Sequence, residues 1–467
     1  MSTSSAERPE GARPRELLLT GWGRTAPSRA EVVEPPSLDA VAEALAGAGP
    51  RGALARGLGR SYGDAAQNAG GRVVAMAGLA SVREVDPERA VARVDAGISI
   101  EALARLLVPL GLFVHVTPGT WHVTVGGAIA ADVHGKNHHR DGTFGDHVLS
   151  FELLTPQGER VTVTRDEQPD LFTATVGGMG LTGVILSATL RLLRVESAHM
   201  VVDRERAANL DQAMARMVES DDQYRYSVAW IDCLARGRSL GRSVLLRGDH
   251  ATADQAPTPA SGNGAAPLDG GARLAAPPWT PPGLLRRSTV RVFNEAYYRA
   301  APVRETGRLE PLRPYFYPLD AVEGWNRIYG PRGFLQYQFV VPDDRGDALR
   351  GALERLTGAG CPSFLGVLKR FGPGEAASRG MLSFPMQGWT LTLDVPAAVP
   401  GLGSLLDSLD ELVAEAGGRV YLAKDSRLRP DVLEAMYPRL GEWRAFRERL
   451  DPGGTMRSDL SRRLGLA

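Results

Sequence analysis

Short apolar runs alternate with amphipathic segments along the first 195 residues of the chain. Runs rich in β-branched residues predict strands, whereas apolar positions at a spacing of 3.6 residues predict helices. We therefore expect helices over residues 37–45, with Ser37 as the N-cap, and over residues 99–110. Strands are expected at residues 73–76, 92–95, 113–116, 148–155, 160–164 and 184–192. This interleaving indicates an α+β fold.

The pattern changes from about Met200 onward. Residues 224–232 and 334–341 predict strands of a second sheet, and residues 419–423 and 430–450 predict a final strand and an amphipathic helix. Residues 251–283 are rich in Ala, Pro, Gly and Ser and can bury too little surface to offset the entropy of ordering, which predicts a mobile loop. A length of 467 residues predicts two domains.

Charge and composition argue against several classes of protein. Lys plus Arg and Asp plus Glu both total 54, and this zero net charge argues against nucleic acid as the main partner. No window approaches the ~18 apolar residues of a membrane span. The polar N-terminus lacks the core of a secretion signal, so residues 1–14 are expected to be a disordered lead-in. These features indicate a protein in the cytoplasm or peripheral to the plasma membrane, with the periplasmic face left open.

Two glycine-rich segments suggest a phosphate-containing cofactor. One spans residues 56–64 (RGLGRSYGD), and the other spans residues 117–139 (TPGTWHVTVGGAIAADVHGKNHH). Glycine lets backbone N–H groups approach a phosphate closely, because no Cβ stands between them. Two such segments in one N-terminal domain suggest a cofactor that contains a diphosphate.

Competing motifs are weaker. Residues 178–183 match G-x-G-x-x-G, but a Rossmann fingerprint opens a helix, and here an apolar β-branched run follows. No metal is expected at His134, His138 and His139, because the intervening Gly-Lys-Asn suits a stable ligand set poorly. The two cysteines, Cys233 and Cys361, have no metal-ligand spacing and are expected to be buried thiols. A Walker lysine motif is absent from the sequence.

Several polar residues remain open to a structural or a functional interpretation. Gln336 and Gln338 share one face of a predicted strand, which is either a solvated face or a substrate contact. Lys369 and Arg370 follow a strand-like run at residues 364–368. Residues 424–427 (KDSR) follow a short strand, where exposed charges are common.

Taken together, these motifs resemble the vanillyl-alcohol-oxidase, or PCMH-type, family of FAD flavoproteins. The resemblance rests on GRSYGDAAQN, PGTWHVTVGGAIAADVHG, GGMGLTG before a strand, and YPRLGEWRAFRERLDP near the end. It implies a two-part FAD-binding domain of PCMH type, formed by residues 15–195 and completed by residues 417–467. An intervening α+β substrate domain, built on an antiparallel sheet, would occupy residues 196–416.

The resemblance assigns roles residue by residue. Arg60 stands where relatives with covalent FAD often have His, which implies noncovalent FAD. Catalytic roles are implied for His134, Lys424 and Tyr62, and substrate contacts for Gln336, Gln338, Lys369, Thr392 and Lys424. Residues implied to bind FAD are Gly57, Gly59, Arg60, Ser61, Tyr62, Gly63, Gly119, Thr124, Gly126, Gly127, Ala131, Asp132, His134, Gly183, Val184 and Tyr421.

The segments HGKNHHRDGTFGDHV, LQYQFV, KRFGPG and YLAKDSR are closer to one branch of that family. This branch oxidises the 2′-hydroxyl of a polyprenylphosphoryl ribose in arabinan synthesis, and a separate NAD(P)H-dependent reductase completes the epimerisation. The resemblance therefore implies a polyprenyl-phosphate sugar substrate, that reductase as partner, and peripheral membrane contact.

Oxidation of a sugar hydroxyl needs a proton acceptor, and His134, Lys424 and a water stay open for that role. Some members carry Asn and Cys where this chain has Thr390 and Thr392. The alternatives are an alditol or aldonolactone oxidase on the same fold, and a nonenzymatic FAD-binding partner protein.

Overall fold

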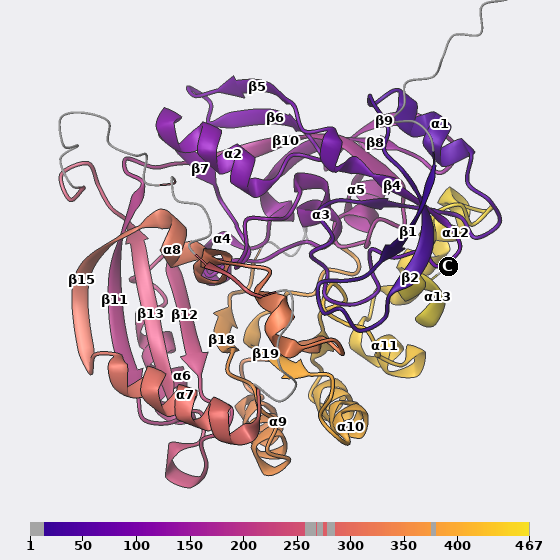
Figure 1. Cartoon of the computed structure of the whole chain (residues 1–467). Helices are drawn as coiled ribbons and strands as arrows, with labels where there is room; N and C mark the ends of the chain where they lie inside the picture. Colours follow the sequence, from indigo (N-terminus) through magenta and orange to yellow (C-terminus); the bar gives the residue numbers. More distant parts are fainter. Residues whose placement is uncertain (1–13, 257–267, 269–273, 278–284, 375–379, 467) are drawn as a thin grey trace, which may run out of the picture.

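A computed structural model of the chain describes residues 14–256, 268, 274–277, 285–374 and 380–466. Figure 1 shows the N-terminal strands and the C-terminal helices α11–α13 on one side of the molecule, with an eight-stranded sheet on the other. Residues 1–13 of the lead-in expected at residues 1–14, and most of the mobile loop expected at residues 251–283, lie outside the described residues. No helix among the described residues is long and apolar enough to cross a membrane.

The first sheet has four strands in the order β1-β2-β4-β3. Its strands are β1 (Arg15–Leu19), β2 (Ser28–Val33), β3 (Ala53–Arg56) and β4 (Arg72–Ala75). Helix α1 (Ala40–Ala46) packs its buried Val41, Ala44 and Leu45 beneath this sheet. The predicted start of this helix is wrong, because Ser37 accepts only a 3.3 Å bond from Ala40 N in the turn that precedes the helix.

The second sheet is antiparallel, in the order β5-β6-β10-β8-β9, with β7 also paired to β10. Ser99 caps the adjoining helix α2 by accepting a 3.0 Å bond from Ala102 N. The G-x-G-x-x-G segment runs directly into β10, which confirms that it does not open a helix. The elements are β5 (Val82–Asp86), β6 (Val91–Asp95), α2 (Ile100–Leu107), β7 (Leu112–Val114), α3 (Val125–Ala130), α4 (His138–Asp141), β8 (Val148–Leu154), β9 (Arg160–Thr164), α5 (Pro169–Thr175) and β10 (Val184–Arg194).

The third sheet has eight antiparallel strands in the order β15-β11-β13-β12-β18-β19-β17-β20. The helices α9 and α10 cover one face of β17 and β19 with leucines, and every residue of β19 is buried. The strands are β11 (His199–Ala207), β12 (Tyr226–Ile231), β13 (Ser243–His250), β15 (Arg304–Pro311), β17 (Phe334–Val341), β18 (Gly366–Phe371), β19 (Gly388–Pro396) and β20 (Arg419–Val420). The helices of this region are α6 (Leu210–Ser220), α7 (Arg287–Ala300), α8 (Leu312–Phe316), α9 (Gly346–Gly358) and α10 (Leu402–Glu415), and β14 (Leu274–Ala275) pairs with β16 (Val322–Glu323).

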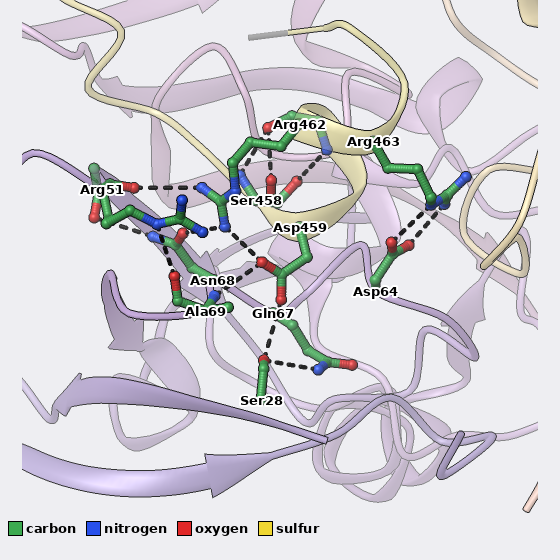
Figure 2. A network of polar contacts seen from close by, with 12 residues as sticks. Ser28, Arg51, Asp64, Gln67, Asn68, Ala69, Ser458, Asp459, Arg462 and Arg463 are labelled. Carbon is green, nitrogen blue, oxygen red and sulfur yellow. Dashed lines mark hydrogen bonds and ion pairs between the residues drawn. The ribbon is translucent and has the colours of Figure 1, made fainter. Parts of the chain in front are cut away.

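The C-terminal segment contacts both halves of the molecule. Strand β20 pairs with β17 of the large sheet, whereas Met456 bridges Ala53 of the first sheet. The single helix expected at residues 430–450 is instead α11 (Pro430–Met436) and α12 (Leu440–Leu450), because Tyr437 leaves the helical conformation and donates its hydroxyl to Val420 O. Helix α13 (Asp459–Arg463) then packs against the first glycine loop (Figure 2).

Candidate active site

A cavity of about 890 Å³ is lined by residues from all three parts of the chain, namely residues 15–195, 196–416 and 417–467. Seventeen of the residues implied by resemblance line it, although they come from loops and strands spread over more than 360 positions of sequence. These residues are Gly57, Gly59, Arg60, Ser61, Tyr62, Gly119, Thr124, Gly126, Gly127, Ala131, His134, Gly183, Gln336, Lys369, Thr392, Tyr421 and Lys424.

Four of the implied residues do not line the cavity but lie behind its wall, so they do not directly contact a ligand in it. Gly63 packs so tightly that an added Cβ would fall 1.8 Å from Asp425 O. Asp132 is fully buried and accepts bonds from Ser383 Oγ (2.5 Å) and Gly145 N (3.1 Å), while burial raises its pKa to about 6. Val184 belongs to the apolar core under the first sheet. Gln338 is covered by His134.

The two glycine segments form one wall of the cavity with backbone rather than side chains. A Cβ on Gly57 would fall 2.2 Å from Thr124 Oγ1, so only glycine lets the two loops meet there. Thr124 in turn accepts a 3.2 Å bond from Gly127 N. An added Cβ on Gly119 would meet no atom within 4 Å, which leaves that backbone open to a ligand. This bare wall fits a diphosphate-containing cofactor such as FAD.

Noncovalent binding of FAD is expected from the groups near this wall. Arg60 stacks its guanidinium 3.9 Å from the centroid of the Trp22 ring and donates to His122 O, and it is not a nucleophile. The two cavity-lining histidines already have polar partners, since His122 Nδ1 lies 3.1 Å from Glu101 and His134 Nε2 lies 2.9 Å from Gln338 Nε2.

Acid precipitation of the holoenzyme should therefore release all of the flavin into the supernatant. A polypeptide mass increased by one flavin would contradict this prediction.

The cavity floor is the polar face of β17, β19 and β18. Cross-strand pairing sets Gln336 beside Asp394, and Lys369 beside Thr390. The strand-like run expected at residues 364–368 is instead β18 (Gly366–Phe371), so Lys369 and Arg370 lie within the strand. Alternation of side chains then turns Lys369 into the cavity and Arg370 outward to Asp221 and Asp343.

Lys424 lines this floor, and the fully buried Asp394 lies behind it. Burial lowers the pKa of Lys424, and the charge of Lys369 lowers it further, whereas Asp394 opposes both effects. Burial likewise raises the pKa of Asp394, which accepts a 2.5 Å bond from Gln336 Nε2. Tyr62 lies with its ring centroid 5.5 Å from Lys424 Nζ, and burial raises the pKa of its phenol well above the ordinary value. Lys424 can therefore exist as a neutral amine beside a carboxyl group.

His134 is held in one protonation state by its neighbours. Thr390 donates its hydroxyl proton to Phe339 O (2.8 Å), so it can only accept from the amide nitrogen of Gln338 (3.0 Å). The same amide nitrogen must then donate to His134 Nε2, which places the ring proton on Nδ1. Burial, aided by the charges of Lys369 and Lys424, lowers the pKa of His134 well below its usual value. The imidazole is therefore neutral, and its one lone pair is occupied.

One signal in the sequence was missed. The chain contains three lysines, Lys136, Lys369 and Lys424, against 51 arginines, and all three lysines line this cavity. Lys136 was therefore identifiable from composition as a site residue. A buried lysine loses its proton far more readily than arginine. Other cavity residues that sequence reasoning missed include the pair Arg204 and Glu310 and the aromatic residues Trp230, Phe293, Tyr297, Trp325 and Phe364.

The histidine-rich segment does not gather around a metal. His139 Nε2 pairs with Tyr224 O at 2.9 Å, and His138 packs on Phe371. Within the described part of the chain, no three His, Cys, Asp or Glu residues are placed to hold a metal ion.

Comparison with known proteins agrees with this geometry. Residues 30–164 match the FAD binding domain family, and residues 397–464 match the D-arabinono-1,4-lactone oxidase family. The chain is 43% identical to decaprenylphosphoryl-β-D-ribose oxidase of Mycolicibacterium smegmatis over 455 residues, which cover 96% of this chain and 97% of that protein. It is also 44% identical to an uncharacterised protein of Streptomyces coelicolor, over 79% of this chain and all of that protein.

A more distant relative is L-gulono-1,4-lactone dehydrogenase of Mycobacterium tuberculosis, which is 24% identical over 96% of this chain and 99% of that protein. The bare glycine wall and the FAD binding domain match agree on the cofactor, which is FAD. The chain belongs to the decaprenylphosphoryl-β-D-ribose oxidase family of PCMH-type FAD oxidoreductases.

Proposed function

We propose that this protein oxidises the 2′-hydroxyl of decaprenylphosphoryl-β-D-ribose to the 2′-keto sugar with FAD. The observation that carries the proposal is the meeting of the bare glycine wall with Lys424 and Gln336 in one cavity, with Asp394 held directly behind Gln336. The near full-length similarity to an oxidase of that name supports the choice of substrate. By the same reasoning, this oxidation is the first half of an epimerisation of the ribose to the arabinose form.

Bound FAD supplies the acceptor for a hydride from the sugar carbon. The residues of this chain handle the accompanying proton. Lys424, as a neutral amine, accepts the proton of the 2′-hydroxyl at Nζ, and Asp394 offsets the positive charge that results. His134 cannot take this role, because Gln338 occupies its Nε2 and Nδ1 already carries a proton. Gln336 fixes Asp394 and thereby the position of the charge.

Two partners follow from this chemistry. A 2′-keto sugar needs a reductase to become the arabinose epimer, and an NAD(P)H-dependent enzyme fits that step. A polyprenyl lipid resides in a membrane, so contact of this protein with the membrane surface, without a span, is part of the proposal.

The deciding experiment is anaerobic addition of farnesylphosphoryl-β-D-ribose to the purified holoenzyme. We expect the visible absorbance of oxidised flavin to bleach. Persistence of that absorbance with the lipid sugar, together with bleaching by an alditol or an aldonolactone, would overturn the lipid assignment. It would favour the second candidate, an alditol or aldonolactone oxidase, to which the match of residues 397–464 points. Bleaching by none of these substrates would leave an FAD-binding protein without this activity.

A further inference from the structure

The three lysines of the cavity differ in their counter-charges. Glu310 raises the pKa of Lys136, and Asp394 raises the pKa of Lys424, so each of these lysines faces a carboxylate. Among the described residues, no carboxylate is close enough to shift the pKa of Lys369, which burial lowers to about 8. Lys369 Nζ donates only to Gly135 O, at 3.4 Å. An enclosed cation whose one partner is a long bond to a neutral carbonyl is suited to an anionic ligand.

Lys136 stands next to Lys369. The bond from Lys369 ends on Gly135, the residue before Lys136, and the charge of Lys369 lowers the pKa of Lys136 beyond the effect of burial, to about 7. Lys136 Nζ donates to the carbonyls of Tyr315 and Phe316 and lies 4.7 Å from the centroid of the Tyr315 ring. Because the two ammonium groups repel each other, an anion between them would stabilise both, and Lys369 more strongly, since Glu310 already faces Lys136.

An apolar strip leads away from this pair of lysines. On β18, Val367 and Lys369 lie on the same face. Val367 pairs with Trp230 on the neighbouring strand β12, and Trp230 and Val228 lie on the same face of β12. Tyr297 of α7 packs on Trp230 with ring centroids 4.7 Å apart, and Phe293 follows at 6.1 Å from Tyr297. Both α7 rings line the cavity, yet they are 41% and 47% exposed. The strip therefore runs from Lys369 to an opening beside α7.

We propose that Lys369 and Lys136 bind the phosphate of a lipid phosphate, and that the strip Val367–Trp230–Tyr297–Phe293 carries its prenyl chain out past α7. This assignment rests on the proposed function for the class of lipid. It sets the direction of the substrate: sugar at Lys424, phosphate at Lys369 and Lys136, and chain toward α7. Lys424 keeps the role at the hydroxyl that the proposed function gives it.

The rarity of lysine makes this proposal directly measurable. Holoenzyme labelled with ¹³C and ¹⁵N in lysine gives three side-chain signals by NMR, and single Lys→Arg variants assign them. Farnesyl phosphate should raise the pKa of Lys369 and of Lys136 by about one pH unit or more, as a nearby opposite charge does. The signal of Lys424 should shift less than either. A shift confined to Lys424 would overturn the assignment.

Two further probes separate the phosphate from the chain. Farnesol, which has the chain without the phosphate, should leave both lysine pKa values unchanged, and an equal rise with farnesol would contradict an anion site. Inorganic phosphate should raise them only at much higher concentration than farnesyl phosphate. Equal potency of the two would overturn the role of the apolar strip.

Binding constants from calorimetry complete the test. Lys369→Met should weaken farnesyl phosphate about a hundred-fold, and Lys369→Arg should retain most of the affinity. Trp230→Ala should weaken farnesyl phosphate about ten-fold and leave inorganic phosphate unchanged. Unchanged affinity in Lys369→Met would overturn the proposal. Because these readouts report binding, they stand apart from flavin bleaching: a holoenzyme that binds as described but never bleaches would refute the proposed function alone.

Discussion

Replacement of Lys424 by methionine should slow flavin reduction by the lipid sugar about 10³-fold, without loss of FAD. Methionine has a similar length but offers no lone pair for the hydroxyl proton and no charge to stabilise the alkoxide. Asp394 would lose its cation, and its pKa would rise further, because the charge of Lys424, after the hydrogen bond from Gln336, lowers that pKa against burial. Anaerobic stopped-flow absorbance measures the reduction rate, and the flavin-to-protein absorbance ratio measures retention of FAD.

Two companion variants sharpen this prediction. Lys424→Arg should stay slow, because a guanidinium keeps its proton in proteins and cannot serve as the acceptor. Lys369→Met should raise the substrate concentration for half-maximal rate far more than it lowers the limiting rate, since Lys369 is assigned to binding. Recovery of a rate near that of the wild type in Lys424→Arg would assign the proton to another group, such as a water.

Replacement of Arg463 by methionine should destabilise the protein by about 3 kcal/mol and weaken FAD retention. Figure 2 shows Arg463 reaching from α13 to Asp64 at the end of the first glycine loop. Its Nε and Nη2 lie 2.9 and 2.8 Å from the Asp64 carboxylate, and Nη2 also lies 2.9 Å from Asp425. Burial opposes the charge of Arg463, but the two carboxylates more than offset it and raise its pKa.

The expected loss of FAD follows from what Arg463 joins. Asp64 ends the loop that supplies Gly57 to Gly63, and Asp425 follows Lys424, so one guanidinium holds the cofactor loop against the loop of the proposed acceptor. Without it, two enclosed carboxylates face each other, and burial already raises the pKa of Asp64. Urea unfolding measures the stability, and the fluorescence of released flavin measures retention.

Arg439→Met is a matched control for this variant. Arg439 pairs with Glu442 on the same C-terminal segment, but the two side chains are 42% and 51% exposed. An exposed pair of this kind contributes about 0–1 kcal/mol, so the control should keep both its stability and its FAD. If Arg463→Met and Arg439→Met had the same free energy of unfolding and the same FAD retention, the ion pairs of Arg463 between the two loops would not stabilise the protein.

The sequence by itself determined the elements whose signals are local. The strand at residues 334–341 coincides with β17, and Ser99 caps its helix as its position predicts. The glycine segments suggested a cofactor that contains a diphosphate, because close approach of backbone to phosphate needs glycine at fixed positions of the chain itself. Where the local signal was ambiguous, boundaries moved. Ser37 lies in a turn before α1, and β18 extends through Lys369 and Arg370.

Only the tertiary structure decided which polar residues meet. Period-two alternation separates Lys369 from Arg370 but does not say which face of β18 borders the cavity; pairing with β12 and β19 does. The protonation state of His134 depends on Gln338 from β17 and Thr390 from β19. Arg463 joins two loops that lie about forty and four hundred residues away in the sequence. Such contacts depend on the free energy of packing distant segments together, which no local pattern of hydrophobic and polar positions encodes.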